Sequence, residues 1–449
     1  MKKLLLALSS LMIASGAFAS SPTGTGTPAD FKWDAEIRTR YTTDSNRNWA
    51  KASSLSNWYQ REKLGATMMR GDNMSGRLSL VHAHRWGDNI AQGGTAGTAP
   101  LPTNGGTFNK VNVGAAGAAD YNVLLVNEAW GWWKAGDNWS VRFGRSGFSF
   151  GDGTIISQND WFDYPHSFDG VWVNFNFDFM DLTAFGIKAW DPDTTLAASN
   201  NSDPETNIYG AVVKAKNLPD VLKYAGLHFF QTNAEDANVG ITGTVNTMRV
   251  GLTLFGDNSG FDYRATGDFL SGKAKQHATT TERDLNSSMF DVEAGYTFAE
   301  FMKARLSFNY HMDSGDSSST DTKTETYLPL RPDTHKFGGL MDAMLWGNST
   351  YFDIGLGVSP MDDLKVGLNY VMFSRTKDTD GITTGFGSVA DTGDKLPVGS
   401  EINLHATKSY GEHFSIHALY GSFTPGDFLK DTGRNETFSR GQVQAQLNF

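Results

Sequence analysis

The residues of this chain that could act in catalysis or bind a metal are scattered along the sequence. A nucleophile with an oriented base, or paired carboxylates beside a histidine, is not apparent, and the chain has no cysteine. His82 and His84 have the spacing of a metal pair on one strand face, but no third ligand stands near them. Asp313, Asp316 and Asp321 lie in a Ser/Thr-rich segment, too loosely spaced for a calcium loop. We predict no catalytic site, no cofactor and no metal, with a weak divalent-cation site in that segment as the alternative to a solvated loop.

Charged side chains instead alternate with apolar ones along short segments. Between residues 31 and 41 the apolar positions are Phe31, Trp33, Ala35, Ile37 and Tyr41. The polar positions between them are Lys32, Asp34, Glu36, Arg38 and Arg40. Residues 302–311 repeat the pattern, with Leu306 and Phe308 on one face and Arg305 and Ser307 on the other. Side chains of a strand point alternately to opposite faces, so one face is expected to meet an apolar medium and the other water.

The two ends of the chain suggest where these strands are used. Lys2 and Lys3, the apolar run 4–13 and the small residues around Phe18 are typical of a secretory signal peptide over residues 1–19. The last eleven residues alternate strictly and end on Phe449, which is typical of the final strand of an outer-membrane barrel. We therefore expect an exported, outer-membrane protein of a Gram-negative-type bacterium.

The connections between the predicted strands alternate between short and long. Tight turns occur at 70–73 and 136–138, whereas loops extend over 87–120, 146–166 and 313–347. Short periplasmic turns and long extracellular loops are the layout of a transmembrane barrel. An open sheet edge would leave backbone groups unpaired in lipid, so the sheet must close. We predict an all-β fold, a closed antiparallel transmembrane β-barrel of about 18 strands around an aqueous lumen.

Composition limits the alternatives. Beyond the signal peptide no stretch is apolar enough for a transmembrane helix, and mean hydropathy is −0.37. The formal net charge of −11 argues against nucleic acid as a partner. We divide the chain into the signal peptide 1–19, a flexible periplasmic lead-in 20–30 and a transmembrane barrel 31–449.

Several segments, taken in order, resemble one family of barrels. They are N-E-A-W-G-W-W (127–133), R-F-G-R (142–145), F-G-D-G (150–153), N-D-W (159–161), S-F-D-G-V (167–171), H-K-F-G-G-L-M-D (335–342), G-S-E-I-N-L (399–404) and F-T-P-G-D-F (423–428). This series resembles the alginate-export family of outer-membrane barrels and its porin-like relatives. The resemblance implies a monomeric, 18-stranded barrel whose pore is constricted by inward loops and by Arg and Lys side chains.

Two positions depart from the family pattern. An arginine usually follows the Gly-Asp pair, where this chain has Thr154 and Ile155, and another usually precedes Ser-Phe-Asp-Gly, where it has His166. Both changes remove cations from the expected constriction, which makes alginate itself a doubtful solute.

The resulting hypothesis is a passive channel for small hydrophilic, anionic solutes, because cations that line a narrow aqueous path favour anions. The expected pore-lining cations are Arg38, Arg40, Arg61, Lys63, Arg77, Arg142, Arg145, Arg249, Lys303, Arg305, Lys365 and Arg440. The alternation of side chains along the predicted strands places four more cations on the inward face, namely Lys32, Lys214, Arg264 and Arg375. The expected lumenal acids are Asp34, Glu36, Asp262, Asp291, Glu293, Asp353 and Glu401.

Two other functions stay open, an exporter of an alginate-like anionic polysaccharide and a structural or adhesive barrel without transport. The expected partners are outer-membrane lipids, the barrel-assembly machinery during biogenesis and the small solutes.

Overall fold

The computed structural model describes residues 29–86, 123–190, 205–235, 243–276, 282–318, 320–391 and 393–449. The expected signal peptide, most of the lead-in and the loop 87–120 lie outside these ranges. Asp30, the last residue assigned to the lead-in, is the first residue of strand β1.

The described chain is almost entirely β-structure. The first strands are β1 (Asp30–Ser45), β2 (Leu55–Arg70), β3 (Met74–Arg85), β4 (Val123–Lys134), β5 (Trp139–Ser146), β6 (Phe168–Asn176), β7 (Met180–Trp190), β8 (Glu205–Ala215), β9 (Tyr224–Glu235) and β10 (Gly243–Asn258). The remaining strands are β11 (Phe261–Gln276), β12 (Glu282–Phe298), β13 (Ala304–Asp313), β14 (Lys323–Thr324), β15 (Ser349–Met361), β16 (Leu364–Arg375), β17 (Ile382–Thr384), β18 (Gly387–Val389), β19 (Pro397–Tyr410), β20 (Phe414–Pro425) and β21 (Phe438–Asn448). Two short helices, η1 (Arg47–Trp49) and α2 (Asp427–Asp431), lie in connections. Within the described residues no helix is long and apolar enough to cross a membrane.

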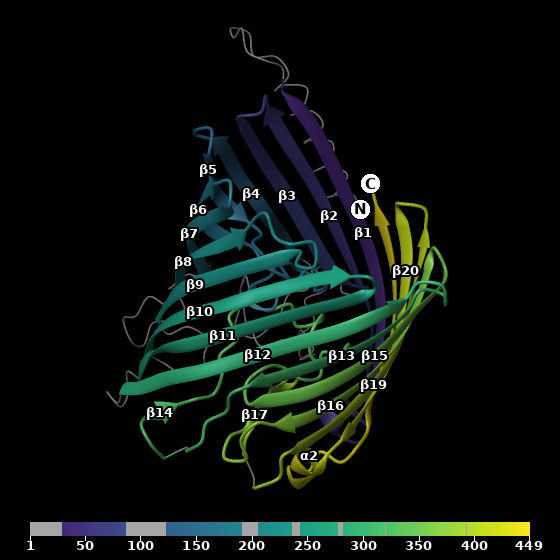
Figure 1. Ribbon diagram of the computed structural model, residues 1–449. Coiled ribbons are helices and arrows are strands. Elements are labelled where there is room, and N and C mark those ends of the chain that lie inside the picture. The colour runs from purple at the N-terminus through teal and green to yellow at the C-terminus, as the bar shows by residue number, and fades with distance from the viewer. Residues whose placement is uncertain are drawn as a thin grey trace, which may run out of the picture.

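The strands close into a ring (Figure 1). Apart from the short β14, which pairs parallel with β12, each strand of the ring pairs antiparallel with its neighbours. Strand β21 returns to pair with β1, from Glu36 opposite Asn448 to Ser45 opposite Ser439. The main sheet has 19 strands, of which β14 is a two-residue segment beside β12, and the other 18 form the closed barrel. Closure leaves no edge strand whose backbone groups would lack partners in lipid. The predicted fold class is confirmed.

The connections differ between the two ends of the barrel, as predicted. At the short-turn end β2 and β3 are joined by Gly71–Asn73, where Gly71 adopts a φ of 57°. At the opposite, long-loop end the connections run through 147–167, 314–348 and 376–396. One predicted strand boundary was wrong. Met302 and Lys303 adopt positive φ in the turn before β13 and are not strand residues.

The outward face of the wall is apolar, and Leu306 and Phe308 are exposed on it. Aromatic side chains at strand ends are also exposed, as expected for girdles at the two membrane interfaces. The exposed members are Trp33, Trp58, Trp86, Trp133 and Trp139. Tyr420 is exposed too, but it lies in the middle of β20 and not at a strand end.

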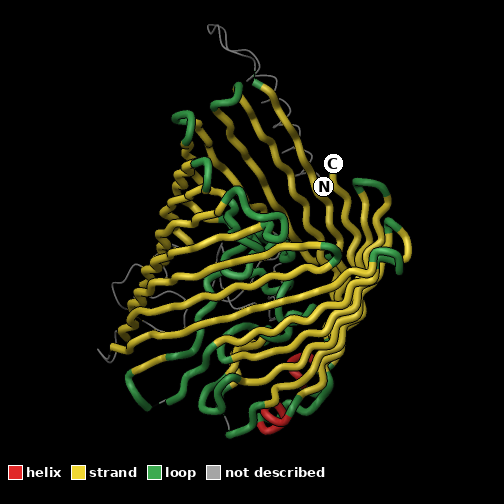
Figure 2. The backbone as a smooth tube through the Cα atoms, viewed as in Figure 1, coloured by secondary structure: helices red, strands yellow, loops and turns green. Residues whose placement is uncertain are grey.

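The lumen departs from the expected open, aqueous interior. Figure 2 shows loops inside the ring of strands. A large apolar cluster joins loop residues such as Phe150, Ile156 and Phe337 to wall residues such as Phe230 and Phe423. Burial of this apolar surface against the wall stabilises the inward loop positions. The expectation of an aqueous lumen rather than a packed core therefore fails where these loops pack.

Candidate solute pathway and its constriction

The first inward loop, residues 147–167, crosses the lumen. At one end Asp160 and its neighbours contact Arg61 of β2, and at the other Asp152 approaches Arg264 of β11, with 3.4 Å between Arg264 Nη1 and Asp152 Oδ2. Strands β2 and β11 lie half-way around the ring from one another. A solute passing through the barrel therefore has to pass this loop.

Guanidinium groups of β1 and β2 hold the tip of loop 147–167 by its backbone carbonyls. Arg61 Nη1 donates to the carbonyl oxygens of Asp160 at 2.8 Å and Phe162 at 2.7 Å. Arg38 donates to the same two carbonyls, at 3.0 and 2.9 Å. Arg40 Nη2 donates to the Trp161 carbonyl at 2.8 Å, and its guanidinium lies 3.9 Å from the Trp161 ring centroid. Charge-assisted bonds of this kind are stronger than neutral ones and anchor the loop to the wall.

The second inward loop, residues 314–348, is anchored by other predicted cations. Arg249 of β10 pairs with Asp268 of β11 at 2.5 Å and donates to the hydroxyl of Tyr327 at 3.1 Å. Arg440 of β21 donates from Nη1 to the Met341 carbonyl at 2.5 Å. At the base of the loop, Asp313 accepts hydrogen bonds from the backbone N–H groups of Gly347 at 3.1 Å and Ser349 at 2.7 Å.

The two inward loops also hold each other. The rings of Trp161 and His335 stack with centroids 3.5 Å apart and an interplanar angle of 5°. Ser157 N donates to the Arg331 carbonyl at 2.7 Å, and Arg331 N donates to the Ile155 carbonyl at 3.0 Å. The constriction is therefore a joint between two loops, and displacing one of them removes contacts of the other.

The structure assigns many predicted pore-lining cations a different environment from the one expected. Six are buried, and their N–H groups donate to carbonyls and carboxylates of the loops and wall. They are Arg38, Arg40, Arg61, Arg249, Arg375 and Arg440. Arg375, for example, donates to the carbonyls of Asp380 and Lys395 at 2.8 and 2.9 Å, in loop 376–396. These six anchor loops.

A second group of inward cations forms ion pairs with the predicted lumenal acids. Arg77 pairs with Asp34 at 2.6 Å, and at the same distance with Glu128, which was not among the predicted acids. Arg305 pairs with Asp262 at 2.5 Å and Glu293 at 2.7 Å.

Arg264 joins the ion-paired group. Its Nη1 lies 2.5 Å from Asp291, and its Nε lies 3.0 Å from Glu293. A cavity of about 440 Å³ lies beside these groups and is also lined by Asp152, Asp257 and Lys336. This side of the lumen carries carboxylates in at least equal number to its cations.

The other predicted inward cations belong to neither the six buried arginines nor the ion-paired group of Arg77, Arg264 and Arg305. Arg142 lies with its guanidinium 4.7 Å from the Trp130 ring centroid, and Lys63 pairs with Asp160 at 3.0 Å. Lys32, Lys214 and Lys365 are exposed. That any of these cations lines the solute path stays a prediction.

Two site predictions are wrong. Arg145 lies on the outward face, because it is three residues from the inward Arg142, and it pairs with Asp169 of β6 at 2.5 Å. Lys303 lies in the turn before β13 and pairs with Asp362 of the neighbouring turn at 3.0 Å. Neither side chain points into the lumen.

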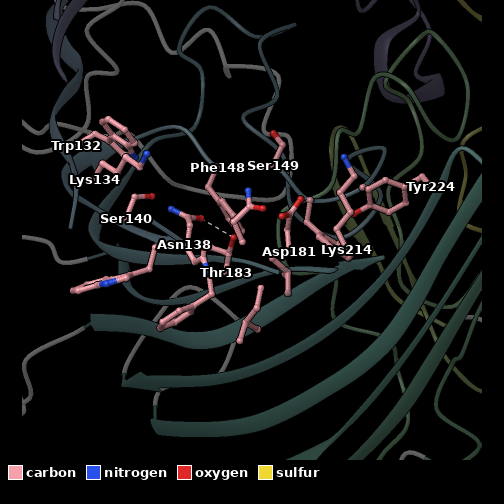
Figure 3. Close-up of a pocket in the computed structure, with 18 of the residues that line it drawn as sticks. Trp132, Lys134, Asn138, Ser140, Phe148, Ser149, Asp181, Thr183, Lys214 and Tyr224 are labelled. Carbon is pink, nitrogen blue, oxygen red and sulfur yellow. Dashed lines mark hydrogen bonds between the residues drawn. The ribbon is translucent and has the colours of Figure 1, made fainter. Parts of the chain in front are cut away.

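A chamber of about 660 Å³ lies between loop 147–167 and the short-turn end (Figure 3). Phe148 and Ser149 of the loop bound one side, and Trp132, Thr183 and Tyr224 come from the wall. Lys134 and Lys214 also line it, and both are exposed. The carboxylates of Asp137 and Asp181 complete the charged part of the lining. Aromatic rings beside a few charged and amide groups form a surface suited to small polar solutes.

His166 and Thr154, the two departures from the family pattern, are both part of the loop joint. Thr154 is buried, and its N–H donates to Asp152 Oδ1 at 3.1 Å. His166 Nδ1 lies 3.2 Å from the Ser157 carbonyl. Burial, with the nearby positive charge of Arg331, lowers the pKa of His166 from 6.5 to about 4. His166 is therefore neutral near pH 7 and supplies no positive charge there.

This lowered pKa predicts that acid loosens loop 147–167. A released His166 takes up a proton near pH 6.5, whereas the seated one takes it up only near pH 4. Seating is therefore fully stable above pH 6.5 and weakens as the pH falls from 6.5 towards 4. Single-channel recordings at about pH 7.5 and about pH 5 are expected to show larger current fluctuations at the lower pH. His166→Gln, which cannot titrate, should reduce the difference, and an unchanged pH response in that variant would refute this role.

The comparisons with known proteins agree with this architecture. The sequence model of a family described as alginate export matches residues 27–442. The chain belongs to the alginate-export family. No curated protein sequence matches this family member significantly.

Three of the solved structures similar to this alginate-export family member come from two bacteria. Pseudomonas aeruginosa OccK8 (OprE) is 14% identical with a TM-score of 0.55, covering 94% of this chain and 98% of that one. Acinetobacter baumannii OccAB4 is 12% identical with a TM-score of 0.57, covering 95% and 99%. P. aeruginosa OpdK, solved with vanillate, is 11% identical with a TM-score of 0.57, covering 94% and 98%. At these identities the likeness extends to the barrel fold alone.

Sequence reasoning missed the residues through which the loops of this family member touch the wall and one another. Trp161, His335 and Met341 carry those contacts. The available signal was their position, because all three fall within the N-D-W and H-K-F-G-G-L-M-D segments that carry the family resemblance.

Proposed function

We propose that this protein is a passive diffusion channel of the outer membrane for small hydrophilic anions, without catalysis. The observation that carries the proposal is the charge around the tip of loop 147–167. Four cations, Arg38, Arg40, Arg61 and Lys63, surround it, and the carboxylates they contact are Glu36, Asp160 and Asp163. Carbonyl partners hold a guanidinium without neutralising it, so this wall keeps positive charge beside the path.

The anion preference is expected to be mild. The opposite wall carries Asp262, Asp291 and Glu293 against Arg264 and Arg305. Exposed acids elsewhere, which make the chain acidic overall, are screened within about 10 Å at about 0.1 M salt and contribute little.

The chamber at the short-turn end supports a small carboxylate as the solute class. OpdK is solved with vanillate, which is an aromatic carboxylate. The rings of Phe148 and Tyr224 and the ammonium groups of Lys134 and Lys214 line the chamber here. The carboxylates of Asp137 and Asp181 also line it, and Asp181 pairs with Lys216 at 2.6 Å. The aromatic side chains could stack on the ring of such a molecule, and a nearby ammonium group could pair with its carboxylate.

The test is the reversal potential of the purified protein in a planar bilayer under a salt gradient. The expected result is a weak anion preference that grows as salt is lowered. Lys63→Gln should reduce it because this side chain is partly exposed beside the loop tip. Lys303→Gln, in a turn outside the lumen, is the matched control and should leave it unchanged. A cation-selective reversal potential would contradict the proposal.

Family membership favours a second candidate, export of an anionic polysaccharide. Thr154 and His166 argue against it, because neither supplies a cation near pH 7 at the loop joint. Block of the single-channel current by alginate oligomers at low concentration would favour export over small-solute diffusion. A third candidate, a structural or adhesive barrel, would instead give no conductance.

The proposed location implies assembly by the outer-membrane machinery and contact with lipids along the apolar wall. The C-terminal Phe449 is exposed, and its N–H donates to the Ala35 carbonyl at 2.9 Å. Deleting Phe449 is expected to reduce the membrane-inserted, heat-modifiable fraction of the protein several-fold. Deleting Asp72, which is exposed in the turn between β2 and β3, provides a control for general destabilisation. A normal inserted yield without Phe449 would refute a role for this residue in assembly.

A further inference from the structure

Three metal-binding side chains meet on the outward face of β2 and β3. Glu62 of β2 is paired in register with His82 of β3, and His84 follows two residues later on the same face. That face points away from the lumen, because Arg61 and Lys63, on either side of Glu62, both contact the inward loop. The third ligand that was not found near His82 and His84 in the sequence is supplied by the neighbouring strand.

The spacing of these groups suits one metal ion. One ligand atom of each residue lies within 4.8 Å of the other two. The Nδ1 atoms of His82 and His84 lie 2.9 and 3.8 Å from Glu62 Oε2. Ligands bound at about 2.0–2.1 Å around tetrahedral zinc are about 3.3 Å apart, so the observed distances bracket the required one.

Further hydrogen bonds orient the carboxylate. Gln60 Nε2 donates to Glu62 Oε1, and the Gln60 amide oxygen accepts a hydrogen bond from Trp86 Nε1 at 2.9 Å. Partners of this kind position metal ligands and raise metal affinity. The Trp86 and Trp58 rings stack with centroids 4.9 Å apart and are exposed, as expected of a membrane interface.

The surroundings make these side chains unusual for their position. Ile37 of β1 lies opposite Glu62, and Leu124 of β4 lies opposite His82, and both apolar side chains are exposed. Ionisable side chains on a face that meets lipid are costly and mark functional sites. A divalent cation bound by His82 and Glu62 would take the place of the proton in their hydrogen bond and balance the negative charge of the carboxylate.

We propose that Glu62, His82 and His84 bind one zinc ion, or a similar imidazole-preferring divalent ion, at the long-loop end of the outer wall. Two imidazoles and a carboxylate select such ions over Mg²⁺ and Ca²⁺, and three protein ligands leave a fourth position open. The ion would join β2 to β3 near the C-terminal end of β3, which ends at Arg85. This proposal is independent of the proposed channel function.

The test is calorimetric titration of Zn²⁺ into the full-length protein in detergent after removal of metals by a chelator. The expected result is one ion per chain, and the same three side chains should give the intense visible absorption of tetrahedral Co²⁺. Glu62→Gln, which removes a ligand, should weaken the affinity by at least about 10–100-fold, which is the cost of losing an outer hydrogen-bond partner of a ligand. The double variant His82→Leu/His84→Leu should abolish binding, and its apolar side chains suit the outward face.

The matched control is His405→Gln/His417→Gln, which removes another pair of neighbouring imidazoles, with centroids 6.3 Å apart, on β19 and β20. It should bind Zn²⁺ like the wild type. Heat-modifiable migration checks that every variant is folded. No stoichiometric binding by the wild type, or equal affinity in the His82→Leu/His84→Leu variant, would overturn the proposal and leave the cluster as a hydrogen-bonded Glu–His pair.

Discussion

Replacing Arg61 with alanine is expected to release the tip of loop 147–167 and to increase both single-channel conductance and current noise. Arg61 is 1% exposed and holds the carbonyls of Asp160 and Phe162 and the carboxylate of Glu36. Removing one partner of a buried ion pair costs about 3–5 kcal/mol, because the other charge is left buried and uncompensated.

Lys63→Ala is the matched control for the Arg61 variant. Lys63 lies on the same strand and contacts the same loop residue, Asp160, through one ion pair that is partly exposed. Pairs of this kind contribute about 0–1 kcal/mol, so the loop should stay seated and the conductance should change little. Equal conductance and noise in the wild type and Arg61→Ala would show that the loop does not depend on this anchor.

Replacing Arg249 with leucine is expected to unseat the other inward loop, 314–348. The buried Asp268 accepts bonds from Arg249, His228 and Tyr327, so the substitution leaves a buried carboxylate without its cation. The expected cost is again about 3–5 kcal/mol. The temperature at which the folded, heat-modifiable form is lost should fall. The single-channel conductance should rise.

A double variant separates the buried charge from the loop contact. Arg249→Leu/Asp268→Leu removes both charges, and buried ion pairs replaced by apolar groups are often tolerated. Its stability should recover in part, whereas the loop, without its contacts to Tyr327 and Leu328, should stay released. Lys273→Ala, which breaks the exposed pair with Glu282, should change neither property. If Arg249→Leu is as stable as the wild type, groups other than Arg249 balance the negative charge of Asp268.

The sequence alone determined the architecture of this protein because that information is local. Alternation along residues 31–41 and 439–449 identified the apolar and polar faces, since successive side chains of a strand must point to opposite sides. Gly and Asn at the tight turns marked the short-turn end. A closed barrel then followed from the need to pair every backbone group in lipid.

Local irregularities limited the same reasoning. An extra residue at Asn127 shifts the register between β3 and β4, so that Glu128 points inward beside Arg77 while Val126 is exposed on the outer wall. The positive φ of Lys303 ends the alternation before β13 begins. One such residue reverses every side-chain assignment beyond it, and alternation by itself cannot show where that happens.

Only the tertiary structure decided what the lumenal cations do. Arg61 meets Asp160 and Phe162 about a hundred positions away along the chain, and Arg40 meets Gln444 across the closure of the barrel. The loops bring carbonyls, an apolar cluster and the stacked rings of Trp161 and His335 into a space that strand parity alone leaves open to water. The register of β2 against β3 likewise set Glu62 beside His82 and His84. Parity determines the side of the wall on which a residue lies, whereas the groups it meets there depend on how distant segments pack.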